Sequence, residues 1–378
     1  MNVLHVANYF TGPRVFKNLV TALDELGIQQ TIYTAFKGVH LIGKNKPELR
    51  RTDSVIVYRP ILSFYTRLNY IYKSRKITED LQEHIQIKEC DLLHAHTWYS
   101  DGHAAYNISK KYGKKYIVTI RNTDLNVFFK YFIHLRKKAK EVLLNAEKII
   151  FISRAYQSRL LSHPYFSGIA EELSEKSIVI PNGINEFWLK NVYQRHSGLS
   201  EPVQLLFVGK YDKGKNLLPL INIVADLNRS GVKCVLHTAG GGQGRHYDKI
   251  MKLIKNNPGI VADHGQVSDK LKLLELYRAS DIFIMPSNSE TFGLVYVEAL
   301  SQGIPVIFTK NEGIDGYFEK NIGEAVNNKD KEEVKNAITK IINNYSSYDF
   351  KPEKIVLSFD WAIVAKEYES VYKKILCA

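Results

Sequence analysis

The sequence predicts an α/β protein built from two doubly wound halves. Short apolar runs that suit buried strands alternate along the chain with longer amphipathic stretches that suit helices. The 378 residues leave room for two domains of ordinary size, and an apolar content of 45% is enough for a core in each. We therefore expect an N-terminal domain of residues 1–185, a polar and irregular linker of residues 186–202, and a C-terminal domain of residues 203–359.

The first half opens with an expected strand at Val3–Asn8, a helix at Phe16–Leu26 closed by Gly27, and a strand at Gln29–Thr34. The loop between the first strand and the helix carries one glycine, Gly12, and lacks the G-x-G-x-x-G fingerprint. This argues against a dinucleotide-binding dehydrogenase. Apolar runs predict further strands in this half at residues 91–96, 116–120, 148–153 and 178–180.

Charge is distributed unevenly along the chain. The net charge is +13; residues 1–185 hold 27 Lys and Arg against 16 Asp and Glu, whereas residues 186–378 hold 25 against 23. A basic half suits an anionic partner such as a membrane surface, a phosphate-bearing carrier or an acidic glycan. No nucleic-acid recognition motif accompanies the charge, so we expect no nucleic-acid partner.

Three scattered cysteines, with no C-x-x-C spacing, suit a reducing cytoplasm. The N-terminus has the pattern of a strand rather than of a signal peptide, and no apolar run approaches the ~20 residues of a membrane span. Two stretches, residues 62–76 and 128–140, mix aromatic with basic residues and are expected to be helical. They suit either a membrane interface or an aromatic core stripe with a solvated basic back, and the charge asymmetry favours the membrane.

Two histidines, His94 and His96, end the expected strand at residues 91–96. Imidazole suits zinc, but no third ligand lies at a recognisable spacing, so we predict no metal site. The expected strand at residues 116–120 leads into Arg121, whose guanidinium remains charged and can stabilise phosphate but cannot act as a base.

The second half opens with an expected strand ending at Val208 and a loop with Lys210, Lys213 and Lys215 before a helix from Leu217. The next expected strand leads into a glycine run, residues 240–244, where the backbone can approach a ligand closely. A short strand then ends near Gln266. Each signal alone also fits an ordinary solvated loop.

Residues 280–308 are the most informative stretch. Asp281–Met285 suits a buried strand, Thr291–Gln302 a helix with Gly303 at its C′ position, and Val306–Phe308 a new strand. Two carboxylates frame the helix: Glu290 at its entrance and Glu298 near its middle, where a carboxylate among apolar neighbours needs a partner.

This stretch resembles the signature of the family 4 retaining glycosyltransferases, which have the GT-B fold. The matching pattern runs Pro286-Ser-x-x-Glu290-Thr-Phe-Gly-Leu-Val-x-x-Glu298-Ala-Leu-x-x-Gly303-x-Pro305-Val-Ile. The resemblance implies two Rossmann-like domains facing a central cleft, with the donor held by the C-terminal half and the acceptor by the basic N-terminal half. It also implies that the terminal helix, residues 360–378, packs back on the first domain.

The resemblance also implies roles for individual residues. Glu290 would contact the hydroxyls of the donor sugar and Glu298 the donor ribose. Lys210, in place of a family arginine, and Lys215, with Lys213 as a rival, would clamp the diphosphate. Arg121 stands where many members have a histidine near the donor sugar. The remaining donor-binding candidates are Thr291, Phe292, Gly293, Leu294, Gly241, Gln266 and Gly12.

The implied reaction is sugar transfer from a nucleoside diphosphate sugar, with UDP or GDP as the expected nucleotide and no metal or cofactor. The charge asymmetry and the aromatic–basic stretches point to a lipid-linked glycan acceptor at the cytoplasmic membrane face, as in bacterial surface polysaccharide assembly. Two alternatives stay open. One is a nucleotide-sugar-binding protein without turnover; the other is an epimerase or dehydrogenase, for which Tyr72–Lys76 or Tyr106–Lys110 would supply a Y-x-x-x-K pair.

Overall fold

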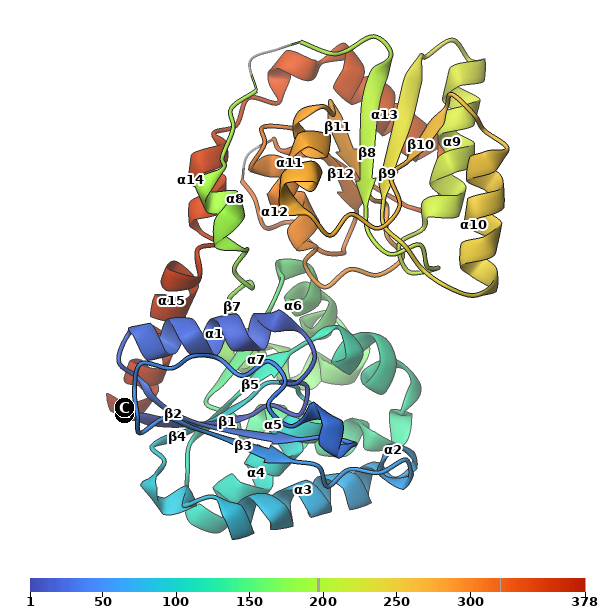
Figure 1. Cartoon of the computed structure of the whole chain (residues 1–378). Helices are drawn as coiled ribbons and strands as arrows, with labels where there is room; N and C mark the ends of the chain where they lie inside the picture. Colours follow the sequence, from blue (N-terminus) through green and yellow to red (C-terminus); the bar gives the residue numbers. More distant parts are fainter. Residues whose placement is uncertain (196–197, 320, 378) are drawn as a thin grey trace. The chain divides into compact units, whose positions relative to one another are not determined.

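The chain folds into two compact units. The computed structural model describes residues 1–195, 198–319 and 321–377, without the side chains of Arg67 and Leu68. The first unit comprises Met1–Ile152, Tyr156–Gly183 and Phe359–Ala378, and the second comprises Ser153–Ala155 and Ile184–Ser358 (Figure 1). Across this described part of the chain, none of the helices has the length and apolarity needed to span a bilayer.

The first unit is built on a sheet of seven parallel strands in the order β3-β2-β1-β4-β5-β6-β7. Strand order reverses next to β1, so the carboxyl ends of β1 and β4 flank a switch point where ligands bind in such sheets. The strands are β1 (Asn2–Val6), β2 (Gln29–Ala35), β3 (Val55–Arg59), β4 (Leu92–Ala95), β5 (Tyr116–Ile120), β6 (Lys148–Phe151) and β7 (Ser177–Val179).

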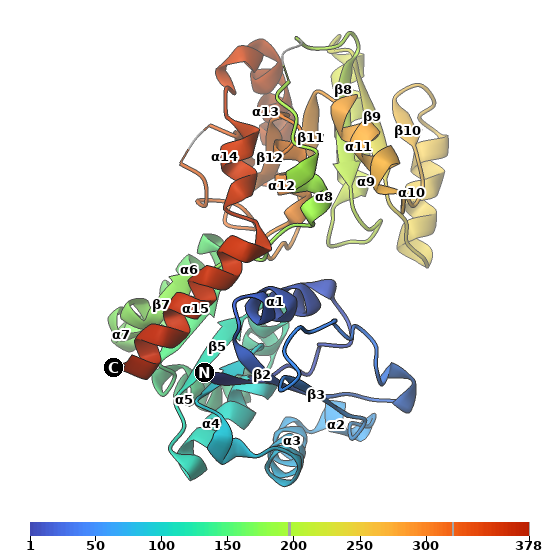
Figure 2. The ribbon, with the colours of Figure 1, turned by 60° about the vertical axis from the view of Figure 1, so that its left-hand side comes forward.

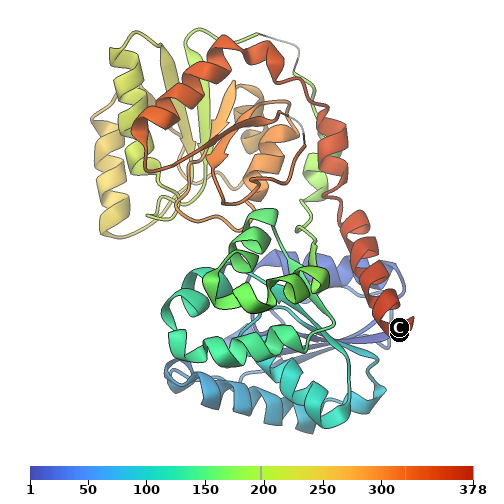
Figure 3. The same cartoon turned by 180° about the vertical axis from the view of Figure 1, so that it is seen from behind.

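Helices cover both faces of this sheet. One face packs against helices between α3 and α7, which Figure 3 shows from blue to green, and the other against α1 and α15. The helices are α1 (Arg14–Glu25), α2 (Tyr65–Leu68), α3 (Tyr70–His84), α4 (Ser100–Tyr112), α5 (Arg136–Leu144), α6 (Arg154–Leu161), α7 (Ala170–Lys176) and α15 (Trp361–Cys377), with short turns η1 (Val39–Leu41), η2 (Ile87–Glu89), η3 (Asp124–Phe129), η4 (Ile133–Leu135) and η5 (Pro164–Ile169).

Helix α15 belongs to the first unit although it comes from the C-terminal end of the chain (Figure 2). Its apolar stripe, with Val364, Tyr368 and Tyr372, packs in one cluster with Val3 of β1 and Leu23 of α1. Helical spacing places these side chains on one face, which explains why the stripe is buried. Ala378, the last residue expected in this helix, lies outside the described residues.

The second unit is built on six parallel strands in the order β10-β9-β8-β11-β12-β13. Figure 1 shows α11 and α12 in front of this sheet, and Figure 3 shows α13 on its other side. The elements are β8 (Val203–Val208), β9 (Cys234–Ala239), β10 (Val261–Asp263), β11 (Ile282–Ile284), β12 (Val306–Thr309), β13 (Gly323–Val326), α8 (Glu186–Lys190), α9 (Leu217–Arg229), α10 (Arg245–Lys255), α11 (Lys270–Arg278), α12 (Leu294–Leu300), α13 (Lys331–Asn343), η6 (Tyr345–Ser347) and α14 (Pro352–Leu357). Two doubly wound parallel sheets confirm the predicted fold class.

The segment expected as an irregular linker is more ordered than its composition indicates. It contains α8, whose Trp188 is buried, and Arg195, which forms an ion pair of 2.5 Å with the fully buried Asp281. Backbone N–H groups of Ser200 and Gln204 also donate to that carboxylate. Much of residues 186–202 therefore packs on the second unit, while positions 196–197 lie outside the described residues.

Two expected helices differ in the structure. Residues 128–140 are divided among η3, η4 and α5, because Phe128 stacks on Tyr99 and Phe129 stacks on Trp98 in the core. Residues 62–76 contain α2 and the start of α3 rather than one helix. In residues 128–140 the burial of aromatic rings outweighs helical continuity.

Candidate functional site

The carboxyl ends of β8 and β9 in the second unit border a hollow of about 670 Å³. Three of the residues predicted to bind the donor, Lys210, Gly241 and Gln266, line it. Lys210 is exposed to solvent and lies two positions after the end of β8, while the other two come from loops after β9 and β10. The structure therefore brings these separately predicted residues together at the sheet edge where α/β proteins bind ligands.

Glycine is required in the wall of this hollow because two backbones meet there. A Cβ atom on Gly240 would lie 1.8 Å from the carbonyl oxygen of Gly209, a distance that no side chain tolerates. The Gly240 N–H in turn donates to the Gly265 carbonyl at 2.7 Å. The glycine run is thus an ordered close approach of loops rather than a flexible turn.

Tyr211 and Asp263 hold the same wall in place, and sequence reasoning missed both. The Tyr211 hydroxyl donates to Asp263 Oδ1 at 2.5 Å, and Thr238 Oγ1 donates to the same oxygen at 2.9 Å. The signal available in the sequence was position alone, because Tyr211 follows Lys210 and Asp263 ends a short apolar run.

Glu290 and Lys215 form an ion pair between two loops of the second unit. Both side chains are largely buried, and Lys215 comes from the loop before α9 whereas Glu290 comes from the loop after β11. Lys213, the rival for the second lysine position, is exposed. Of these two lysines, Lys215 is therefore the one that pairs with Glu290.

The backbone around Glu290 is fixed by the loop after β12. Glu312 accepts a hydrogen bond from the Glu290 N–H at 2.9 Å, and the Gly313 N–H donates to the Glu290 carbonyl at 3.0 Å. A Cβ atom on Gly313 would lie 2.8 Å from the Phe292 carbonyl, so this loop also needs its glycine. Sequence reasoning assigned no role to Glu312, which hydrogen-bonds to the backbone of Glu290.

The helix after Glu290 is shorter than predicted. Gly293 has φ +83°, so α12 begins at Leu294 instead of Thr291, and Glu290 lies in a loop. The predicted start of this helix at Thr291 was therefore wrong. Phe292 is buried against Tyr317, and the Thr291 N–H donates to Glu290 Oε1 at 3.1 Å. Gly303 has φ +68°, as predicted for a C′ residue.

Glu298 has partners within the protein. Tyr277 donates its hydroxyl to Glu298 Oε2 at 3.1 Å, and Trp188 also hydrogen-bonds to the carboxyl. Burial outweighs these contacts and raises the pKa of Glu298 to about 7. A carboxylate offers about four acceptor positions, so two donors leave capacity for ribose hydroxyls.

The other two predicted residues, Arg121 and Gly12, belong to the first unit. Arg121 Nε donates to the His96 carbonyl at 2.9 Å, and its guanidinium lies 4.4 Å from the Phe16 ring centroid. Gly12 lies in the loop after β1, where Asn45 donates to its carbonyl at 2.9 Å. The other ten predicted site residues belong to the second unit.

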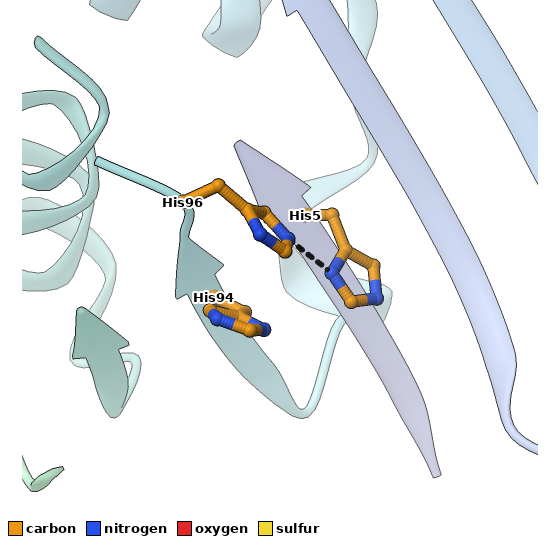
Figure 4. A group of neighbouring side chains, drawn as sticks. All are labelled: His5, His94 and His96. Carbon is orange, nitrogen blue, oxygen red and sulfur yellow. Dashed lines mark hydrogen bonds between the residues drawn. The ribbon is translucent and has the colours of Figure 1, made fainter. Parts of the chain in front are cut away.

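Three histidines gather in the first unit (Figure 4). They contact Phe16 of α1 and Tyr368 and Tyr372 of α15. His5 of β1 joins His94 and His96, with nitrogens of the three within 4.8 Å of one another. Sequence reasoning missed His5 because it is remote in the chain from the other two. Alternation along adjacent parallel strands places all three on the same face of the sheet.

The hydrogen bonds of this cluster favour neutral, structural histidines over a metal site. His94 uses both ring nitrogens, with the Tyr372 hydroxyl at 2.8 Å and Thr119 Oγ1 at 2.9 Å. His5 Nδ1 lies 2.9 Å from His96 Nε2. Burial lowers the pKa of all three histidines, and the nearby Arg121 charge lowers it further for His94 and His96. The same positive charge opposes a metal cation.

Two buried carboxyls lie near Arg121, and sequence reasoning gave neither a role. Asp124 accepts from the Arg121 N–H at 2.9 Å, and Asp101 accepts from the Asn8 side chain. Burial raises the pKa of Asp101 to about 7 and that of Asp124 to about 6. The Asp124 charge raises the pKa of Asp101 further. The available signal was that each follows the carboxyl end of a predicted strand.

Comparisons with known proteins cover both halves of the chain. Residues 12–186 match the family model Glycosyltransferase Family 4, and residues 191–353 match the model Glycosyl transferases group 1. An uncharacterized glycosyltransferase of Methanocaldococcus jannaschii, MJ1178, is 27% identical over 312 residues, which are 81% of this chain and 80% of that protein. The putative teichuronic acid biosynthesis glycosyltransferase TuaC of Bacillus subtilis is 26% identical over 309 residues, which are 78% of this chain and 73% of TuaC.

Solved structures share the fold. A sucrose-phosphate synthase of Thermosynechococcus elongatus superposes with a TM-score of 0.74 at 18% identity, covering 100% of this chain and 99% of that one. The Anabaena protein HepE, solved with UDP and glucose, has a TM-score of 0.66 at 16% identity, with 99% of this chain and 99% of that chain covered. The fold and the family models define the chain as a glycosyltransferase with the GT-B fold. The match of each half to a glycosyltransferase family model supports the resemblance to the family 4 glycosyltransferases.

Proposed function

We propose that this enzyme transfers a sugar from a nucleoside diphosphate sugar to a lipid-linked glycan in cell-surface polysaccharide biosynthesis, with retention at the anomeric carbon. The observation that carries the proposal is the Lys215–Glu290 ion pair in the same unit as the glycine-walled hollow. A carboxylate for sugar hydroxyls and a lysine for phosphate are the two chemistries that such a donor requires. The 26% identity to TuaC supports the polysaccharide role.

The proposed mechanism needs no metal. Lys210 and Lys215 offset the charge that develops on the leaving diphosphate, and Glu290 orients the donor sugar through its hydroxyls. The acceptor oxygen bonds to the anomeric carbon on the face from which the diphosphate leaves, and the departing phosphate oxygen takes the acceptor proton. Arg121 of the first unit is the second catalytic candidate, as a cation for phosphate.

A panel of nucleotides tests the donor assignment. UDP and GDP are the expected ligands, with ADP, dTDP and CMP as comparisons, and thermal unfolding is measured for the wild type and for Glu298→Ala. We expect one diphosphate to raise Tm in the wild type and to lose most of that effect in the variant. A shift of equal size in both proteins would remove Glu298 from the nucleotide site.

Nucleotide binding should depend on pH through Glu298. Its pKa of about 7 lies above the ordinary value of 4.5, so the carboxyl is protonated below neutrality in the free protein. Ribose hydroxyls donate to the ionised form, so binding requires loss of that proton. Affinity should therefore rise about tenfold per pH unit between pH 5 and 7 and level off above.

Calorimetric titration with the nucleotide from pH 5 to 8.5 measures this slope. Glu298→Gln is the matched control, since its amide does not titrate but any ionisation of the nucleotide itself remains. Identical slopes for the wild type and Glu298→Gln would show that Glu298 is not coupled to binding.

The first unit carries an exposed aromatic–basic surface that supports the membrane part of the proposal. Its exposed apolar side chains come from two segments that adjoin where the Tyr70 and Phe128 rings lie 6.4 Å apart. Tyr65 is 75% exposed and Tyr131 66% exposed, which is unusual for rings of this size unless they meet a partner. The apolar members are Phe64, Tyr65, Ile71, Tyr72, Val127, Tyr131, Phe132 and Ile133, and the basic members are Lys73, Arg75, Lys76, Lys130 and Lys137.

We propose that this surface rests on the anionic cytoplasmic face of the membrane, with the enzyme a peripheral membrane protein. Aromatic rings favour the interfacial region, and each lysine or arginine near an anionic surface contributes about 1 kcal/mol. Tyr65→Ser with Tyr131→Ser should therefore lower binding to phosphatidylglycerol vesicles at least tenfold in a flotation assay. Tyr193→Ser, at an exposed tyrosine of the second unit, is the control. Equal flotation of all three proteins would contradict the assignment of this surface.

A further inference from the structure

A second hollow, of about 340 Å³, lies entirely within the first unit. Its walls come from the loop after β1, the end of β2 and the segment that leads into α2 and α3. Asn8, Gly12 and Thr66 are among the lining residues. The hollow is therefore at the carboxyl edge of the sheet, where open α/β sheets bind ligands.

The charge of this hollow is positive. Lys37 and Lys73 line it, and none of the described lining residues is Asp or Glu. Lys37 is exposed, with its Nζ 5.9 Å from the Phe64 ring centroid, and Lys73 is partly buried. Two ammonium groups around a small hollow suit a ligand with a compact negative charge.

The nearest buried acid does not cancel this charge fully. Asp101 lies behind Asn8, which donates to its Oδ1, and the Lys73 charge acts to lower the Asp101 pKa. Burial has the larger effect and raises the pKa to about 7, so the carboxyl is only partly ionised at neutral pH. A ligand anion therefore meets net positive charge.

The hollow also borders the aromatic–basic surface. Ser63 and Thr66 line the hollow, and the two residues between them in the chain, Phe64 and Tyr65, are 57% and 75% exposed. Lys73 belongs to both the hollow and the surface. A ligand whose anionic group enters the hollow can thus place an attached apolar chain against exposed rings without crossing the protein.

We propose that this hollow binds the phosphate group of the acceptor, with Lys37 and Lys73 as its cationic partners. The inference rests on the proposed function and deepens it, because it specifies an acceptor that carries phosphate close to the sugar that is glycosylated. The phosphate belongs to a lipid carrier or to a free sugar phosphate. Both sources present the same oxygens to the two lysines.

Binding of free phosphate ester is measured first. Calorimetric titrations use α-D-glucose 1-phosphate and, as the neutral probe, glucose, both in saturating UDP so that the hollow of the second unit is occupied. The proteins are the wild type, Lys37→Gln/Lys73→Gln, and the charge-matched control Lys110→Gln/Lys111→Gln, whose exposed lysines lie on α4 of the same unit. We expect the sugar phosphate to bind the wild type and the control, and to bind the Lys37→Gln/Lys73→Gln protein at least about tenfold more weakly.

The lipid source is measured separately, by flotation with phosphatidylcholine vesicles that contain phosphatidic acid or lack it. In either assay, a fall in binding of at least about tenfold in the Lys37→Gln/Lys73→Gln protein, with unchanged binding in the control, supports phosphate binding in this hollow. The assay that shows this fall identifies the source of the phosphate. Unchanged binding in both assays overturns the inference. The UDP-induced rise in Tm is measured for every variant. A rise in Tm together with unchanged phosphate binding refutes the phosphate site but not the proposed function. If no nucleoside diphosphate raises the Tm of the wild type, the proposed function is refuted.

Discussion

Replacing Glu290 by glutamine should lower kcat for sugar transfer by at least about 100-fold while leaving the Kd for the nucleoside diphosphate within about threefold. The side chain is held by Lys215, by the Thr291 N–H and, through its backbone, by Glu312 and Gly313. Holding a partly buried carboxylate in one orientation costs side-chain entropy and desolvation, which is expected where its orientation matters for function. The loss should appear in kcat because, in the proposed mechanism, Glu290 orients the sugar and does not hold the nucleotide.

Glu324→Gln is the matched control for this substitution. Glu324 is also a carboxylate of the second unit, and it forms an ion pair of 2.9 Å with Lys340. It lies on β13 and is not among the residues that line the glycine-walled hollow. Initial rates and nucleotide titrations on both variants separate the two effects. A kcat within tenfold of the wild type for Glu290→Gln would remove this residue from the catalytic machinery.

Replacing Gly240 by alanine should destabilise the second unit by at least about 2 kcal/mol and abolish nucleotide binding. The new Cβ would overlap the Gly209 carbonyl oxygen, so β8 and β9 must separate at the edge that borders the hollow. Chemical denaturation followed by circular dichroism measures the stability, and titration with the nucleotide measures the site.

Gly241→Ala distinguishes this clash from a general intolerance of alanine. A Cβ atom on Gly241 meets only the Gln266 side chain, at 3.4 Å, which is ordinary contact. This variant should keep its fold and bind nucleotide with a modest loss. Equal stability of the two variants would show that the close approach of the two backbones is not required.

Local patterns were sufficient to predict the fold because each unit repeats one simple rule. Buried parallel strands appear as short apolar runs, and the helices between them end at glycines such as Gly27 and Gly303, both of which have positive φ. The family resemblance was needed to select Lys210, Gly241 and Gln266 as donor-binding candidates. They lie together because each follows a strand and all carboxyl ends of a parallel sheet share one edge.

Sequence patterns failed where contacts join distant segments. His5 lies 91 residues from His96, and Glu312 lies 22 residues from Glu290, so no spacing rule connects them. The start of α12 at Leu294 was missed because a glycine with positive φ can lie within a stretch of helix-forming residues. The division of residues 128–140 among three short elements reflects rings that are buried against Trp98 and Tyr99.

Slow hydrolysis of the donor tests retaining sugar transfer from a nucleoside diphosphate sugar, and it requires no knowledge of the acceptor. Proton NMR follows UDP- and GDP-linked α-hexoses incubated with the enzyme, and early spectra identify the anomer released before it equilibrates in water. We predict that the α-hexose appears first, that it appears with one donor class, and that Glu290→Gln abolishes it. Release of the β-hexose first would contradict the retaining mechanism, and identical hydrolysis by Glu290→Gln would contradict the proposed site.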